Sequence, residues 1–263
     1  MKLGRGTAAF AVALLLGGCA WLEPPIDESE LADPALGPAE ELLRSVPGAG
    51  APAYRFTIGG GGSCMRAEGV ADIAGEAFQL TITMDGPEAG SSISMGFLVL
   101  GEETWIRLRL EPAAIGEQLG IPDGWVAFDP ERVESFRIEA DGGGTDPVGA
   151  GDLLANAAGV ARAGNRRYSG TLDLTKVTDP MLLSAEQVTA LGEAATSVPF
   201  TASVDAGGRL SALTTQIPAG GGKAGGTCRI AFTDYGKAAT PAAPVATDRS
   251  EEAEEKIYEI LSS

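Results

Sequence analysis

The sequence predicts a mainly β fold of the α+β class, in which an antiparallel meander of strands is accompanied by a few helices. Short segments alternate apolar and polar residues, as strands with one buried face do, and they recur at intervals of roughly ten residues. The 37 glycines and 16 prolines gather mostly in clusters between these segments, where they favour turns. Few stretches have the spacing of a helix.

Residues 1–18 have the features of a secretory signal peptide. Lys2 and Arg5 precede an apolar run that is shorter than the ~20 residues needed to span a bilayer. The run ends in Leu16-Gly17-Gly18-Cys19, which resembles the lipobox of bacterial lipoproteins. The resemblance implies cleavage before Cys19, a lipid anchor on its sulfur, and a protein held on the outer face of the cell membrane. The alternative is an ordinary signal peptide followed by an incidental cysteine.

Residues 19–36 are rich in proline and acidic residues and show no periodicity, which predicts a flexible stalk. A short helix is expected at 38–45, because Pro38 suits a first helical turn and Glu40 and Glu41 suit its positive end.

Alternating segments then predict two groups of strands separated by short helices. The expected strands are 54–58, 63–73, 78–84, 93–99, 104–110, 123–128, 168–174, 198–204, 209–217 and 228–234. The expected helices are 152–158 and 184–194, and Ser184 with Gln187 predicts a capping box for the second. Residues 244–263 form an acidic tail or a short helix that docks Ile257, Ile260 and Leu261.

The chain is strongly acidic, with a formal net charge of −17. A polyanion repels nucleic acid, so no nucleic-acid partner is expected. It also repels anionic lipid surfaces, so membrane attachment depends on the acyl chains of the anchor and not on a basic patch.

Cys64 and Cys228 remain once Cys19 is assigned to the lipid. An exported protein meets an oxidising compartment, where disulfides persist. The sequence therefore favours a Cys64–Cys228 disulfide, which would bring the first strands of the domain beside the last. Two buried free thiols are the alternative.

The chain contains no histidine, which removes the commonest general base and the usual zinc ligand. Its glycine runs lack the context of a phosphate-binding loop, and no Gly-x-Ser-x-Gly motif is present. We therefore expect no enzyme activity, no catalytic or metal-binding residues and no cofactor. The acidic, glycine-rich stretch 141–146 lacks the ligand register of a calcium loop, so a solvated turn is expected there. An envelope hydrolase with clustered carboxylates is the weakest alternative.

Apolar residues on the strand faces suggest a pocket of lipid size, because few helices are available to cover the sheet. A completely filled core is the alternative. The cavity wall is predicted to comprise residues from two strands and two helices: Phe78, Leu80, Ile82, Met84, Ile93, Met95, Phe97, Val99, Leu153 and Val188.

The order of short motifs resembles that of the actinobacterial LppX/LprG-type lipoproteins and their LolA/LolB-like relatives, over about residues 36–243. The motifs are Gly101-Glu102-Glu103-Thr104-Trp105-Ile106-Arg107, Pro122-Asp123-Gly124-Trp125-Val126, Asp152-Leu153-Leu154, Tyr168-Ser169-Gly170-Thr171-Leu172-Asp173-Leu174, Val198-Pro199-Phe200, Asp205-Ala206-Gly207-Gly208-Arg209-Leu210 and Phe232-Thr233-Asp234-Tyr235-Gly236.

This resemblance implies a curved antiparallel half-barrel with helices on its concave side, formed here by residues 37–243 as a lipid-binding domain. It also implies a lipid or lipoglycan ligand held between sheet and helices, and transport of that ligand, with an envelope transporter as partner. The family has no shared catalytic residues, and we expect a monomer. The alternative is a non-catalytic interaction or sensor lipoprotein of the same fold without a lipid cargo.

Overall fold

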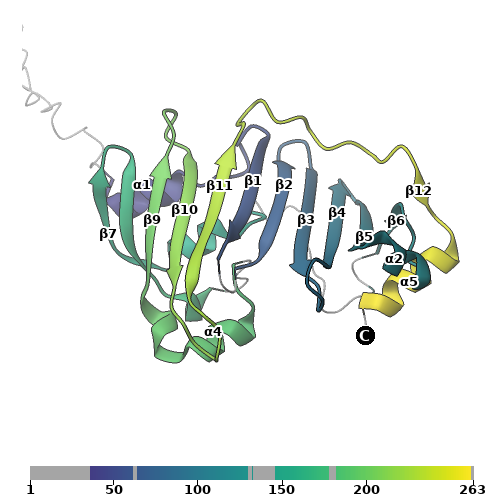
Figure 1. Ribbon diagram of the computed structural model, residues 1–263. Helices are drawn as coiled ribbons and strands as arrows, with labels where there is room; N and C mark the ends of the chain where they lie inside the picture. The colour runs from purple at the N-terminus through teal and green to yellow at the C-terminus, as the bar shows by residue number, and fades with distance from the viewer. Residues whose placement is uncertain (1–35, 62–63, 130–131, 133–145, 178–181, 262–263) are drawn as a thin grey trace, which may run out of the picture. The chain divides into compact units, whose positions relative to one another are not determined.

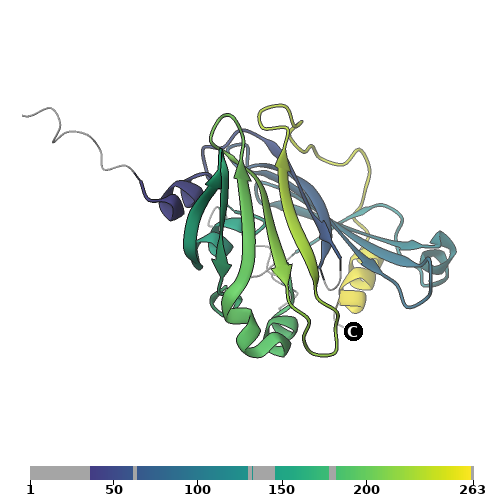
Figure 2. The same cartoon turned by 60° about the vertical axis from the view of Figure 1, so that its left-hand side comes forward.

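The computed structural model describes residues 36–61, 64–129, 132, 146–177 and 182–261. Over this part of the chain the fold is mainly β, as predicted, with one open, curved sheet of twelve strands and few helices (Figure 1 and Figure 2). The strand order is β12-β6-β5-β4-β3-β2-β1-β11-β10-β9-β8-β7. Two meanders, β1 to β6 and β7 to β11, therefore meet where the first strand pairs with the eleventh.

The first meander contains β1 (Tyr54–Gly60), β2 (Arg66–Asp72), β3 (Ala77–Asp85), β4 (Ser92–Leu100), β5 (Glu103–Glu111) and β6 (Trp125–Ala127). The second contains β7 (Ala157–Gly164), β8 (Arg167–Leu172), β9 (Val198–Val204), β10 (Leu210–Ile217) and β11 (Gly226–Thr233). The edge strand β12 (Thr247–Asp248) runs parallel to β6. The expectation of a wholly antiparallel sheet is wrong at this edge, because β12 arrives from a long crossing segment and not from a hairpin.

The α-helices are α1 (Pro38–Arg44), α2 (Ala113–Gln118), α3 (Ala150–Ala155), α4 (Ala185–Leu191) and α5 (Glu251–Leu261), and the 3-10 helices η3 (Leu174–Lys176) and η4 (Gly192–Ser197) flank α4. The predicted capping box of α4 is confirmed, since the Ser184 hydroxyl accepts the Gln187 N–H and the Gln187 side chain accepts the Ser184 N–H. Leu42 of α1, Leu153 of α3 and Ile257 of α5 all belong to one buried core cluster with the sheet.

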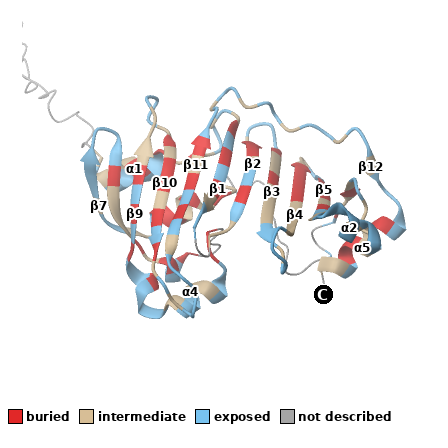
Figure 3. Cartoon of the chain, viewed as in Figure 1, coloured by how far each residue is buried: buried red, intermediate tan, exposed pale blue. Residues whose placement is uncertain are grey.

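The alternation along the strands places apolar side chains on one face of the sheet. Tyr54, Phe56 and Ile58 of β1 are buried, whereas Arg55 and Thr57 between them are exposed. Figure 3 shows the same alternation of buried and exposed residues along β9, β10 and β11. The pattern continues across the seam, because Phe56 lies opposite Phe232 and Ile58 opposite Ile230.

The sequence-based prediction was wrong for residues 152–158. The helix there is α3, which ends at Ala155, and β7 begins at Ala157. This edge strand consists of Ala, Gly, Val and Arg and is mostly exposed, so it has no apolar alternation that could identify it. Helix α2 and strand β12 were also missed, because both are very short.

The C-terminal residues form the helix that was one of the two alternatives. A segment with exposed residues such as Val245 leads from the end of β11 across the sheet to β12 (Figure 1). The following helix, α5, buries Ala253 and Ile257. These residues lie in the same compact unit as the sheet, which spans residues 36–263.

Candidate functional site

The eight predicted wall residues of β3 and β4 lie on one face of the sheet. They form four directly opposed cross-strand pairs: Phe78 with Val99, Leu80 with Phe97, Ile82 with Met95, and Met84 with Ile93. Cross-strand neighbours on one face have Cβ atoms about 5 Å apart, so the pairs form a continuous apolar surface. We call these eight residues the apolar wall.

Neighbouring strands extend this wall on both sides. On β5, Ile106, Leu108 and Leu110 lie opposite Phe97, Met95 and Ile93. On β2, Gly69 lies opposite Leu80 and is followed by Phe56 of β1. The Phe56 ring stacks on the Phe78 ring at a centroid distance of 5.8 Å. The wall is therefore part of the apolar face of the whole sheet.

Burial changes along the wall from one end to the other. Phe97 and Val99 are 0% and 4% exposed, and Leu80 is also buried. Ile82, Ile93 and Met95 are half-buried, and Met84 is 43% exposed at the end next to the β3–β4 turn. Phe78, which lies opposite Val99, is also half-buried, so the wall is most deeply buried at Leu80, Phe97 and Val99 and most exposed at Met84.

The two helical residues predicted for the wall lie elsewhere in the core. Leu153 of α3 is buried, and α3 packs against α1. Val188 of α4 is half-buried, and α4 packs against η3 and η4. Since α1 contacts β7 and η4 contacts β8, these helices cover the second meander.

Helix α5 packs instead at the β6 end of the first meander. The Tyr258 ring stacks on Phe128 at 5.6 Å, and the Tyr258 hydroxyl accepts the Asp129 N–H at 2.8 Å. Ile257 is 1% exposed and lies in the same core cluster as Ile106 and Val126. The apolar spacing in the C-terminal sequence indicated this docking for Ile257, but it did not identify β6 as the target.

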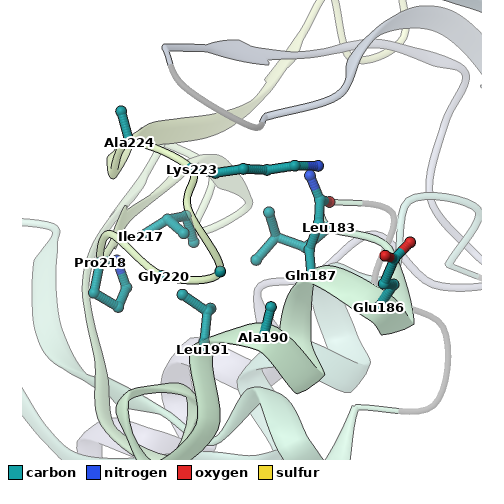
Figure 4. A pocket seen from close by; sticks show the side chains of 11 residues that line it. Leu183, Glu186, Gln187, Ala190, Leu191, Ile217, Pro218, Gly220, Lys223 and Ala224 are labelled. Atoms are coloured by element: carbon teal, nitrogen blue, oxygen red, sulfur yellow. The ribbon is translucent and has the colours of Figure 1, made fainter.

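A small cavity lies between α4 and the β10–β11 turn (Figure 4). Its volume is about 60 Å³, and its apolar lining includes Leu183, Leu191 and Ile217. In Figure 4 the ends of the Lys223 and Gln187 side chains lie close to each other at one edge of this cavity. An apolar cavity that binds benzene measures about 150 Å³, so this one accommodates only a fragment of an acyl chain.

A wider groove of about 940 Å³ lies along β1, β2 and β3 under the β3–β4 turn. Thr57, Glu68 and Thr81, which follow one another across three strands on the face opposite the apolar wall, line this groove. Its lining also includes Ile58 and Ala67, which lie in register with Ile82 of the wall. The Arg66–Asp85 ion pair lies at the same groove. None of the ten predicted wall residues lines this groove or the smaller cavity.

Cys64 and Cys228 form a disulfide, as the sequence favoured, with Cα atoms 5.5 Å apart. Cys228 lies on β11 opposite Gly60 of β1, so the bond crosses the seam between the two meanders. Cys19, the stalk and residues 141–145 lie outside the described residues.

Asp146 differs from the expected solvated turn. It is half-buried, and its carboxylate accepts the backbone N–H of Gly151 at the start of α3. Burial raises the pKa of Asp146, although hydrogen bonds from backbone N–H groups of α3 oppose that shift. Burial and the nearby Asp146 charge raise the pKa of Tyr54, whose hydroxyl has no hydrogen-bond partner among the described residues. The Asp146 carboxylate therefore helps to position the start of α3.

Among the described residues, no group of three or more Cys, Asp or Glu side chains is arranged to hold a metal ion. No helix in the same part of the chain is both long and apolar enough to cross a bilayer. Comparison of the sequence with models of known protein families and with curated proteins finds no match to either.

Proposed function

We propose that this protein is a membrane-anchored envelope lipoprotein that binds a lipid or acylated molecule on the apolar wall and helps to carry it. The half-barrel arrangement of LolA-like proteins and membership of the LppX/LprG-type lipoproteins are part of the proposal. Cys19 would attach the protein to the outer face of the cell membrane. A lipid or lipoglycan would be the ligand, an envelope transporter would be a partner, and the protein would act as a monomer without catalysis.

The gradient of burial along the apolar wall is the observation that supports this proposal most. A face that serves only as core is expected to be covered along its whole length, because exposed apolar area is costly at about 25 cal/mol per Å². Here Met84 is exposed and Ile93 beside it is half-buried, while Leu80, Phe97 and Val99 farther along the wall are buried. An acyl chain that entered at Met84 would extend along the wall towards Phe97.

Binding would be driven by burial of the acyl chain. Each CH₂ group removed from water contributes about 0.8 kcal/mol, so a long chain needs no charged contact to bind. Displacement of the half-buried Ile82, Ile93 and Met95 side chains would be part of the process, and Met side chains adapt readily because they are unbranched.

Native mass spectrometry of the protein isolated from its own envelope tests the proposal. A bound species with the mass of a lipid is expected, and it should disappear after organic extraction. A fluorescent fatty-acid probe added to the extracted protein should then bind saturably. Protein that carries no extractable lipid and takes up no probe would contradict lipid binding.

Two substitutions on neighbouring residues of β4 locate the site. Ile93→Asp places a charge on the wall and should abolish probe binding. Ser94→Asp places the same charge on the opposite face, since successive side chains of a strand point to opposite sides, and should leave probe binding unchanged. Equal effects of the two substitutions would mean that the probe does not occupy the apolar wall.

A second candidate function is a non-catalytic interaction or sensor lipoprotein of the same fold without lipid cargo. The observation that favours it is packing: the core cluster extends from β8 to β6 and includes residues of α1, α3 and α5. In that case Met84 and Leu119, which is 53% exposed, would be parts of a protein contact surface. Co-purification of a stoichiometric protein partner in place of lipid would favour this alternative.

A further inference from the structure

Two arginines on the sheet face opposite the apolar wall stand beside each other without carboxylate partners. Arg107 and Arg109 occupy alternate positions of β5, so they share a face, and their Cα atoms are about 7 Å apart in an extended strand. Among the described residues, neither forms an ion pair. Nine other cations do: Arg44, Arg55, Arg66, Arg132, Arg162, Lys176, Arg209, Arg249 and Lys256.

Acidic residues outnumber basic ones, 36 to 19, in the chain. Five further described cations also have no ion pair among the described residues: Arg166, Arg167, Lys223, Arg229 and Lys237. Two carboxylates are close in the fold: Glu111 follows Arg109 on the same face of β5, and Asp123 precedes β6, whereas Glu68 shares the face three strands away from Arg107. None of them lies within ion-pair distance of either guanidinium. Asp123 does act on Arg107: burial and the Arg109 charge lower the pKa of Arg107, and the Asp123 charge opposes them. Arg107 and Arg109 thus act on each other and share one area of the surface, with Asp123 as an acidic neighbour of Arg107 beyond ion-pair distance.

The Arg107 side chain is held in place by an aromatic ring. Its guanidinium carbon lies 4.5 Å from the centre of the Trp125 ring. A Cβ at Gly96 would lie 3.3 Å from that ring, so the glycine makes room for it. Arginine stacked on an aromatic face keeps the N–H groups at the edge of its plane available, and these groups match the oxygens of a phosphate.

Hydroxyl groups continue the polar surface from these arginines to the wide groove. Thr83 pairs with Ser94, which lies opposite Arg109, and the two hydroxyls are 3.3 Å apart. Thr81 lies opposite Gly96, which in turn lies opposite Arg107. Both threonines line the groove of about 940 Å³, which is formed by β1, β2, β3 and the β3–β4 turn and does not include the two arginines in its lining.

We propose that Arg107 and Arg109, supported by Trp125, form a binding site for a phosphate group, with the hydroxyls of Thr83 and Ser94 beside it. The shared chemistry is a phosphate or phosphate ester, carried either by a small molecule or by a lipid headgroup. The site lies on the opposite face from the apolar wall, and it does not depend on acyl-chain binding.

The test is an NMR titration of the protein with inorganic phosphate and with glycerol phosphate, against sodium chloride at the same ionic strength. The Trp125 indole N–H and the Arg107 Nε–H signals should shift saturably with the phosphates and not with chloride. Shifts that follow chloride equally would overturn the proposal.

Charge-removing variants provide the control for location. Arg107→Gln with Arg109→Gln should weaken phosphate binding at least tenfold. Arg229→Gln removes an exposed arginine from the same face of β11, where it donates to the Thr214 hydroxyl at 3.4 Å, and should leave binding unchanged. Undiminished phosphate binding by the double variant would overturn the proposal. If the double variant does not fold, the shifts of the Trp125 and Arg107 signals in the unaltered protein decide whether the site exists.

A vesicle arm distinguishes the two sources of phosphate. The Cys19→Ser protein, which carries no anchor, is mixed with phosphatidylglycerol or phosphatidylcholine vesicles. Sedimentation with the anionic vesicles that requires Arg107 and Arg109 assigns the site to a lipid headgroup. Saturable glycerol phosphate binding without sedimentation assigns the site to a small phosphate ester. If the protein neither sediments with the anionic vesicles nor binds glycerol phosphate saturably, the proposed site is refuted.

Discussion

The Cα atoms of Cys64 and Cys228 lie 5.5 Å apart although 164 residues separate the two cysteines. Their disulfide joins the segment before β2 to β11, beside the pairing of β1 with β11. The two meanders share no other direct strand pairing among the described residues. The disulfide therefore reinforces the one pairing that unites the sheet.

Replacing both Cys64 and Cys228 with serine should lower the free energy of unfolding by roughly 2–5 kcal/mol, because the bond restricts a long loop of the unfolded chain. Urea denaturation followed by circular dichroism measures the change. Cys19→Ser is the matched control, since Cys19 lies outside the loop, and should leave the midpoint in place. Equal midpoints for all three proteins would show that the seam is stable without the bond.

Gly69→Ala should destabilise the protein by about 1–3 kcal/mol, as expected for overpacking of a core. Its Cβ would overlap the Phe56 ring, at 2.7 Å from Cε1, and also the Gln79 carbonyl oxygen. Gly59→Ala in β1 is the control, because no atom lies within 4 Å of its Cβ position. Thermal unfolding of the two variants should separate them, and equal losses would mean that the Phe56 ring moves away freely.

Ile257→Ala tests whether α5 is part of the core. The side chain is 1% exposed, so its truncation should cost roughly 2–5 kcal/mol. Val245→Ala, in the exposed segment before α5, should change stability by less than about 0.5 kcal/mol. If the Ile257 variant unfolds at the same urea concentration as the unaltered protein, α5 does not contribute to global stability.

Asp146 should make stability fall as pH rises. Burial raises its pKa in the folded state above the ordinary value of 3.8, so the folded protein binds this proton more tightly than the unfolded chain does. The contribution is present in full below pH 3.8 and is lost as pH rises through the folded pKa. Asp146→Asn cannot titrate.

The comparison of the two proteins isolates this effect, since other carboxylates are common to both. The free energy of unfolding of Asp146→Asn minus that of the unaltered protein should increase from pH 3 to pH 7, because only the unaltered protein loses the contribution of this proton. Urea denaturation at each pH measures the difference. A difference that is constant over this range, or that changes in the opposite direction, would contradict the raised pKa.

Replacing Cys19 with serine should release the protein from the membrane without unfolding it. The predicted anchor lies in the N-terminal segment, whereas the apolar wall belongs to the compact unit of residues 36–263. Membrane fractionation measures release, and the fatty-acid probe measures binding by the released protein. Loss of probe binding together with release would show that anchor and wall do not act separately.

Local patterns in the sequence determined much of the first meander. The alternation in residues 78–84 and 93–99 identified β3 and β4 and the side chains that share a face, because side chains of a strand alternate with a period of two. Ser184 and Gln187 identified the start of α4, because a capping box is formed within four residues. Such features depend only on residues that are close in the chain.

Contacts between distant segments were decided by the tertiary structure. The sequence did not show that α5 reaches β6, that β12 runs parallel to β6, or that Leu153 and Val188 lie over the second meander. The stack of Gly96, Trp125 and Arg107 also joins three different strands. Periodicity indicates which side of a segment is apolar, but what packs against that side depends on how the whole chain folds. For this physical reason the sequence alone left two alternatives, a pocket beside the apolar wall and a completely filled core.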